Sequence, residues 1–227
     1  MLDFYWLEYT HKDQPWLFSV VLYTNWCNFR CFWCHNRTLA GWDYEKQTLN
    51  KWSPNIKQVS TDTYHQKLTK DEIKLAIEND FLDMVILCWW EVLIHPIKEI
   101  EETIKWMKNI NPNLFIRIDT NGSFPDKVKY LKENKLVDWF AIDIKWPYWN
   151  SNYYPTIEKV IWLPNKTLKK IYSKIMDSIK IADWMKYTLF RTVIYPIVED
   201  QEYFNEIKQF VNKNLNSKHS LNIFQNV

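Results

Sequence analysis

The chain has 227 residues, with 29 Lys and Arg against 27 Asp and Glu, and its formal net charge is +2. This balance gives no indication of a nucleic-acid partner, because the lysines are interspersed with acids as on solvated helix faces. No apolar run approaches the roughly 18 residues of a membrane span, and no signal-peptide pattern is evident, so we expect no membrane association. One domain over residues 1–227 is long enough to bury a full core.

Predicted strands and helices alternate along the chain. The apolar runs that predict strands are 17–23, 84–88, 114–118, 139–144, 187–194 and 221–224. Apolar spacing of three to four residues, with a capping-box pair at Thr69 and Glu72, predicts helices over 69–79, 97–110, 125–134, 168–181 and 201–214. Residues 41–68 are polar and weakly periodic, which predicts an irregular insertion, and a long loop is expected through Pro164. Six strands alternating with helices predict a parallel sheet with right-handed crossovers, too few for a closed eight-stranded barrel.

Three cysteines, Cys27, Cys31 and Cys34, lie within eight residues with the spacing C-x3-C-x2-C. Three thiolates on one loop can bind three irons of a [4Fe–4S] cluster and leave the fourth iron open for a substrate. A structural metal site normally has a fourth protein ligand. The missing ligand therefore indicates chemistry at the metal.

Alternative roles of the three cysteines stay open. They could be buried apolar side chains, although two short spacings in one loop argue against this. A zinc site could add His35 or Cys88, but His35 is adjacent to Cys34 and both could reach one metal only under strain. A disulfide framework is disfavoured because the chain has only 4 cysteines.

The cysteine run, within residues 25–36, resembles the cluster motif of the radical S-adenosylmethionine (SAM) superfamily, in its branch of glycyl-radical-enzyme activating proteins. Activating proteins of anaerobic ribonucleoside-triphosphate reductases are the most similar, over nearly the whole chain. Val92 departs from this pattern, because the family usually has proline after the glutamate. The other matching segments are Gln14-Pro15-Trp16, Cys88-Trp89-Trp90-Glu91, Asp119-Thr120-Asn121-Gly122, Asp143-Ile144-Lys145, Phe190-Arg191-Thr192 and Phe224-Gln225.

The resemblance implies an α/β fold, an open partial (βα)6 barrel of the radical SAM type, with a [4Fe–4S] cluster and SAM as cofactors. In this family, the reduced cluster cleaves SAM to a 5′-deoxyadenosyl radical, which removes a hydrogen atom from a glycine of a partner enzyme. The implied partners are a glycyl radical enzyme, here anaerobic ribonucleotide reductase, and an electron donor such as flavodoxin or ferredoxin. Cysteines that remain free for a cluster require a reducing compartment, so we expect the cytoplasm.

The resemblance also implies roles for individual residues. Trp33 would lie near the SAM adenine, segment 89–91 would meet the SAM amino group, and Lys145 would pair with the SAM carboxylate. Asp119 could instead cap a turn, Lys145 could be a surface lysine, and Arg191 could form a structural ion pair. The implied cluster ligands are Cys27, Cys31 and Cys34. The residues implied around SAM or a nearby cation are Trp33, Trp89, Trp90, Glu91, Asp119, Thr120, Asp143, Lys145 and Arg191.

The composition is unusual in one respect, because the chain has 14 Trp and only 2 Gly. Ordinary usage predicts roughly 16 Gly at this length. Trp16, Trp26, Trp89 and Trp90 stand where a turn or a close ligand favours glycine, and so do Trp146 and Trp149, which flank Pro147 in a loop. We expect many tryptophans to be glycine in the living organism, because some bacteria read the codon UGA as glycine whereas a common alternative table reads it as tryptophan. Trp33 and Trp139 are expected exceptions.

Two further functions remain possible from the sequence. The same chemistry could activate another glycyl radical enzyme or modify a small molecule, although the extra cysteines of the two-domain activators are missing. If the tryptophans are real, they would block the SAM segment. The chain could then be a catalytically inactive metal-binding module.

Overall fold

A computed structural model describes residues 1–14, 16–29, 31, 66–88, 91–155, 157, 165–194 and 201–223. These residues contain a seven-stranded sheet in which the strand order equals the chain order. Strand β1 (Trp6–Thr10) pairs antiparallel with β2 (Ser19–Tyr23), and all later neighbours pair in parallel. The later strands are β3 (Met84–Cys88), β4 (Phe115–Thr120), β5 (Trp139–Asp143), β6 (Leu189–Ile194) and β7 (Lys218–Ile223).

All six predicted strands are present, and the predicted α/β partial barrel is confirmed. The prediction lacked β1, whose five residues are mostly exposed and show no alternation of apolar and polar side chains. This strand exists because its backbone pairs with β2, from Trp6 opposite Tyr23 to Thr10 opposite Ser19. The sheet is open, with β1 at one edge and β7 at the other.

The five predicted helices are also present, and two have the predicted bounds. They are α1 (Lys70–Ile77), α2 (Ile97–Ile110), α3 (Pro125–Glu133), α5 (Asn165–Ala182) and α6 (Gln201–Asn214). The start of α1 is the predicted capping box, in which Thr69 and Glu72 exchange hydrogen bonds. Two short 3₁₀ turns, η4 (Val92–Ile94) and η5 (Ser151–Tyr153), lie in connections. The predicted long loop is partly helical, because it contains η5. Of the predicted insertion, the structure describes only residues 66–68, which lead into α1.

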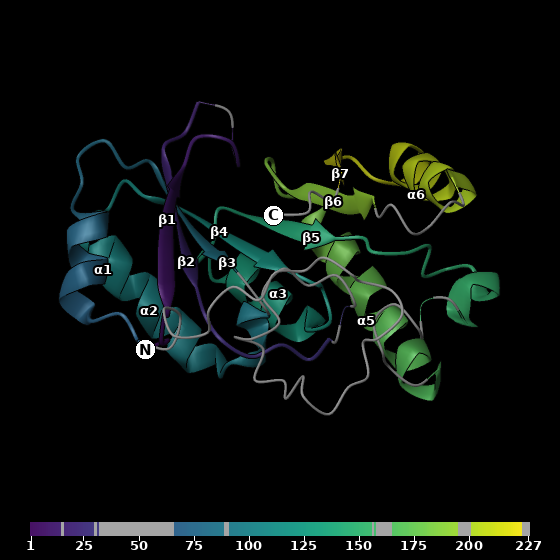
Figure 1. Ribbon diagram of the computed structural model, residues 1–227, viewed down its shortest axis with the longest axis horizontal. Coiled ribbons are helices and arrows are strands. Elements are labelled where there is room, and N and C mark those ends of the chain that lie inside the picture. The colour runs from purple at the N-terminus through teal and green to yellow at the C-terminus, as the bar shows by residue number, and fades with distance from the viewer. Residues whose placement is uncertain are drawn as a thin grey trace, which may run out of the picture.

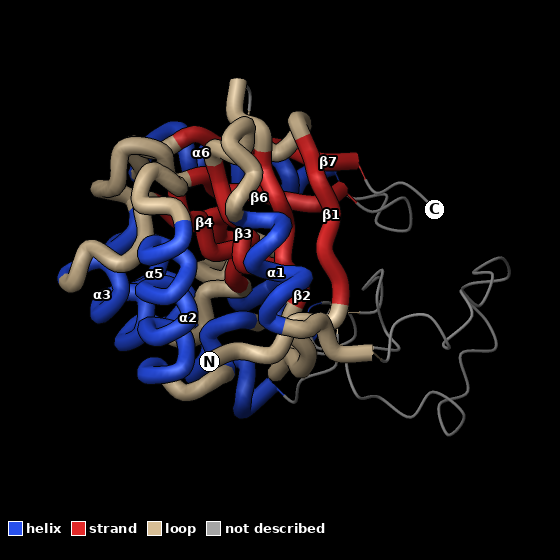
Figure 2. The backbone as a smooth tube through the Cα atoms, turned by 90° about the vertical axis from the view of Figure 1, so that its left-hand side faces the viewer, coloured by secondary structure: helices blue, strands red, loops and turns tan. Residues whose placement is uncertain are grey.

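Helices cover one face of the sheet, as Figures 1 and 2 show for α1, α2, α3 and α5. Alternate strand residues such as Leu22, Leu87 and Ile118 point to this face and pack with helix residues such as Ile104 in the main core. None of the helices in the described ranges is long and apolar enough to span a bilayer.

The opposite face of the sheet has a separate apolar cluster. It contains Val21, Tyr23, Met84, Ile86 and Trp139. The charged side chains of β4, β5 and β6 follow on this face toward the carboxyl ends of the strands. That edge is where parallel α/β folds place their functional sites.

Candidate functional site

The predicted cluster-binding loop, whose described residues are 24–29 and 31, begins directly after β2 and is held by hydrogen bonds at its start. Its described cysteines are Cys27 and Cys31, both half-buried, whereas Cys34 lies outside the described residues. The Trp26 carbonyl accepts the Glu91 N–H at 3.2 Å, and the Asn25 carbonyl is hydrogen-bonded to the His95 ring, also at 3.2 Å. The loop start is therefore attached to the segment that follows β3.

The same loop is attached to the loop that follows β4. Asn28 donates to the Ser123 hydroxyl at 2.8 Å and accepts the Asn121 side-chain amide at 2.9 Å. The Asn121 amide also approaches the Cys27 sulfur at 4.0 Å, and the Phe29 N–H donates to that sulfur at 3.3 Å. N–H groups directed at sulfur suit a thiolate that binds iron, so the described part of the loop fits a cluster.

Glu91 is fully buried and connects two of these loops. Its carboxylate accepts the Thr120 hydroxyl at 2.6 Å, the Asn121 N–H at 2.7 Å and the Leu93 N–H at 3.1 Å. Burial raises the pKa of Glu91 to about 7, against the lowering effect of these three donors. Sequence reasoning placed Glu91 in the SAM segment; its carboxylate organises the loops around that segment.

The glycine that follows in the β4 loop is required by the geometry. Gly122 has φ +77, and a Cβ atom there would lie 3.2 Å from the Ile142 side chain. Its N–H donates to the Thr120 hydroxyl at 3.0 Å. A left-handed backbone at a close approach favours glycine, which keeps the Asp119-to-Gly122 loop tightly folded over the strand ends.

The charged side chains of the site form one continuous chain of ion pairs across β4, β5 and β6. Arg191 lies at its centre and donates to Asp119 at 2.7 Å and to Asp143 at 3.1 Å, and a second guanidinium nitrogen lies 3.0 Å from Asp143. Lys145 pairs with Asp143 at 2.7 Å. Arg117 pairs with Asp119 at 2.7 Å on the other side. We call the five side chains Arg117, Asp119, Arg191, Asp143 and Lys145 the ion chain.

The ion chain keeps its acids ionised. Burial by itself raises the pKa of Asp119, but Arg117 and Arg191 together lower it to about 2. Burial likewise opposes ionisation of Asp143, and Lys145 with Arg191 lowers its pKa below the ordinary value. The pKa of Arg191 is raised, because Asp119 and Asp143 outweigh its burial. The two acids and the two arginines are therefore charged at neutral pH.

Most predicted SAM residues in the described ranges come together in this region. Asp119, Asp143, Lys145 and Arg191 share the ion chain, and Thr120 contacts Glu91. Arg191 thus has the structural ion pairs that were an open alternative, and Lys145 is mostly buried rather than a surface lysine. Trp33, Trp89 and Trp90, with the predicted cluster ligand Cys34, lie outside the described residues.

Sequence reasoning missed Arg117 and Asp13. Arg117 donates to the Asp13 carbonyl at 3.1 Å and to its carboxylate at 3.2 Å. The strand pattern could have indicated Arg117, because it stands two residues before Asp119 in the same strand and its side chain therefore lies on the same face. Asp13 has no local signal, since its contact spans 104 residues of chain.

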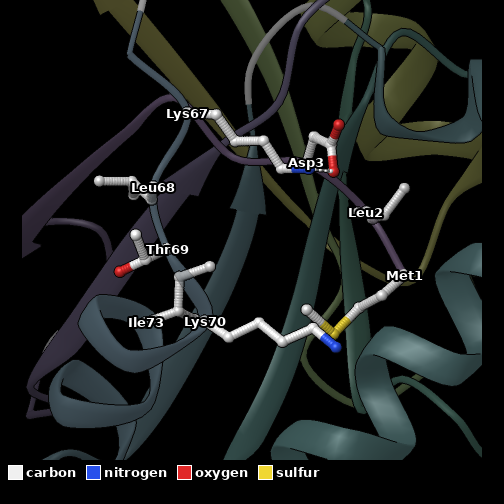
Figure 3. A pocket seen from close by; sticks show the side chains of 8 residues that line it. All are labelled: Met1, Leu2, Asp3, Lys67, Leu68, Thr69, Lys70 and Ile73. Atoms are coloured by element: carbon white, nitrogen blue, oxygen red, sulfur yellow. Dashed lines mark ion pairs between the residues drawn. The ribbon is translucent and has the colours of Figure 1, made fainter.

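A pocket of about 490 Å³ lies elsewhere, between the N-terminal segment and the start of α1 (Figure 3). Its lining includes no residue of the ion chain or of the cluster-binding loop. Lys67 pairs there with Asp3 at 2.6 Å, and Thr69 caps α1. Its lining residues are Met1, Leu2, Asp3, Lys67, Leu68, Thr69, Lys70 and Ile73.

The open sheet is parallel from β2 to β7, with a cysteine loop after β2 and polar loops after β3, β4 and β5. These features together indicate one class of protein. The family model of the radical SAM superfamily matches residues 21–211, and the chain belongs to that superfamily. Membership implies a [4Fe–4S] cluster and SAM as cofactors. The thiolates of the cluster-binding loop are the ligand type that iron–sulfur clusters require.

A more particular similarity comes from a protein of Methanocaldococcus jannaschii, provisionally named a glycyl-radical enzyme activating enzyme. It is 26% identical over 203 residues, which cover 88% of this chain and 70% of that protein. The fold also resembles that of QueE from Escherichia coli, with a TM-score of 0.55 and 12% identity over 99% of this chain and 84% of QueE. The structure of anSMEcpe with bound AdoMet matches with a TM-score of 0.51 and 13% identity. This match covers 87% of this chain and 48% of anSMEcpe, so this chain spans about half the length of that protein.

Proposed function

We propose that this protein is a glycyl-radical-enzyme activating enzyme whose target is anaerobic ribonucleoside-triphosphate reductase. The observation that supports it most is the connection of the Cys27 loop to the Asp119–Gly122 loop through Asn28 and Asn121. This connection joins the loop of Cys27, a proposed cluster ligand, to the polar residues that would surround SAM. The M. jannaschii relative supports the choice of glycyl radical chemistry.

When bound, the cluster and SAM supply a 5′-deoxyadenosyl radical that takes a hydrogen atom from a glycine Cα of the partner. In the proposed site, Cys27, Cys31 and Cys34 bind the cluster. Lys145 and Arg191 attract the SAM carboxylate, and each is held in place by Asp143. Burial at the strand ends limits water around these charges, which strengthens their interactions.

The remaining residues of the proposed site have supporting roles. Glu91 holds the start of η4 against the β4 loop, and the resemblance implies that segment 89–91 would meet the SAM amino group. Trp33 would lie near the adenine, and Thr120 would complete the polar surroundings of SAM. The proposed electron donor is a small redox protein such as flavodoxin or ferredoxin, and the proposed location is the cytoplasm.

The test is anaerobic incubation of the cluster-loaded protein with reductant, SAM and the reductase. We expect a glycyl radical on the reductase by electron spin resonance, together with methionine and 5′-deoxyadenosine. The matched control is Cys31→Ser, which should give no radical. A wild-type protein with a full cluster that cleaves SAM but forms no radical on the reductase would contradict the proposed target.

A second target within the same chemistry is another glycyl radical enzyme, because the name of the M. jannaschii relative specifies no target. The same incubation with a different glycyl radical enzyme distinguishes the two. A catalytically inactive metal-binding module is the alternative of another class. Zinc without iron or labile sulfide in anaerobically purified protein would favour it.

A further inference from the structure

We propose that Arg117 is a positioning residue for SAM, which acts by neutralising Asp119 so that Arg191 and Lys145 keep positive charge for the SAM carboxylate. This inference rests on the proposed function, because it assumes that SAM binds beside the ion chain. Arg117 lies in none of the segments on which the family resemblance depends. It is two residues upstream of the Asp119-to-Gly122 loop.

The geometry of Arg117 is that of a buried, fully engaged guanidinium. Its side chain is 1% exposed, and that of Asp119 is 5% exposed. It donates to both carboxylate oxygens of Asp119, at 2.7 and 3.0 Å. This two-bond arrangement is the strong and directional form of an arginine–carboxylate pair. Asp119 is therefore held by Arg117 independently of its bond to Arg191.

The charge of the ion chain depends on Arg117. With Asp13, which pairs with Arg117 at 3.2 Å, these described side chains are three cations and three acids, and their charges balance. Without Arg117, three acids would face Arg191 and Lys145, and the resulting net charge of −1 would oppose a ligand carboxylate. A buried charge acts on a carboxylate much more strongly than an exposed one.

The other charged groups nearby change this balance little. Asp13 lies in the β1–β2 loop with its side chain 36% exposed, so solvent weakens its effect on a ligand more than that of the buried acids. Glu91 lies near Asp143, but its pKa is raised to about 7, so it is partly protonated at neutral pH. Lys127 provides an opposing charge beside Glu91.

The experiment measures binding by calorimetry on the anaerobic, cluster-loaded protein, with SAM and with decarboxylated SAM as the two probes. We expect Arg117→Met to weaken SAM binding by at least about tenfold, the effect of one charge-assisted hydrogen bond. Binding of decarboxylated SAM should change less than about threefold, because that probe lacks the carboxylate that the net negative charge would oppose. Lys105→Met is the matched control, because it removes one positive charge at a position that is 62% exposed, and it should leave SAM binding within about threefold.

A conservative variant covers the case in which Arg117→Met does not fold. Arg117→Lys keeps a positive charge beside Asp119, so we expect it to bind SAM within about threefold of wild type. Equal weakening of both probes by Arg117→Met, or loss of SAM binding in a folded Arg117→Lys protein, would overturn the role of Arg117. A wild-type protein that loads a cluster but binds no SAM would overturn the proposed function, and this inference with it.

Discussion

The Glu91 carboxylate accepts the Asn121 backbone N–H at 2.7 Å, across 30 residues of chain. This bond joins the segment after β3 to the loop after β4, and Asn121 in turn contacts Asn28 in the cluster-binding loop. Three loops that the sequence separates are thus connected through two residues. The stability of the site should therefore depend on Glu91.

We predict that Glu91→Gln lowers the free energy of unfolding by about 1–3 kcal/mol, because an amide N–H₂ would face one of the three donors. The effect should depend on pH. Burial raises the pKa of Glu91 from 4.5 to about 7, so folding favours a bound proton. The stability that Glu91 contributes is full below about pH 4.5, and it decreases by about 3 kcal/mol as the pH rises through about 7.

Urea unfolding of wild type and Glu91→Gln at pH 4.5, 6 and 8 checks this prediction. The difference between the two proteins should be largest at the lowest pH. A constant difference would show that the Glu91 carboxyl has an ordinary pKa in the folded protein, and a difference that grows with pH would show a lowered one; either result would contradict the prediction.

For Asp119, we predict that replacement by Asn lowers the free energy of unfolding by about 3 kcal/mol at pH 7, because two buried guanidinium groups lose their partner. The sign of the pH dependence is opposite to that of Glu91. The folded-state pKa of Asp119 is lowered from 3.8 to about 2, so its contribution is present above about pH 3.8 and is lost as the pH falls through about 2. Asp80→Asn, at an exposed turn, is the control and should change stability by less than about 0.5 kcal/mol.

Two tryptophans have the backbone conformation of glycine. Trp16 has φ 74 and is 98% exposed, and Trp26 has φ 70 and is 53% exposed. We predict that Trp16→Gly and Trp26→Gly each raise the free energy of unfolding by about 1 kcal/mol, because a left-handed backbone strains any side chain with a Cβ atom. Trp184→Gly is the control, since Trp184 is 78% exposed without a positive φ and should give no gain.

Trp26, together with Trp89 and Trp90, tests the proposed recoding of UGA as glycine. If the source organism reads UGA as glycine, the codons of Trp26, Trp89 and Trp90 are UGA, and peptide masses from native protein show glycine. UGG codons with tryptophan masses would contradict this proposal and favour the inactive metal-binding module. Trp149 makes a tryptophan-specific contact, an indole N–H bond to Glu206 at 2.7 Å, so it is an informative further position.

Metal analysis of serine variants distinguishes the three predicted cluster ligands from the fourth cysteine, Cys88. We predict that Cys27→Ser, Cys31→Ser and Cys34→Ser each lose most iron and labile sulfide after anaerobic reconstitution, because each removes a thiolate ligand. Cys88→Ser should keep both, since the Cys88 sulfur lies at the end of β3 with Asp119 at 3.5 Å. Loss of metal in Cys88→Ser, with zinc in the wild type, would support the alternative zinc site.

Local features of the sequence determined most of the fold. The bounds of α2 and α6, the capping box at Thr69 and the six parallel strands were predictable, because apolar periodicity and caps act between residues a few positions apart. The cysteine run and the Asp119-to-Gly122 segment indicated the site for the same reason. Each motif carries its chemistry within one loop.

Only the tertiary structure decided how these loops meet. Strand β1 has no pattern of its own and forms through its register with β2. The contact of Asp13 with Arg117 depends on how the β1–β2 loop returns to β4, and the bonds of Arg191 to Asp119 and Asp143 depend on the order of three strands. Ion pairs between distant segments have no sequence period, because their partners are chosen by strand order and by the burial that makes an unpaired charge costly.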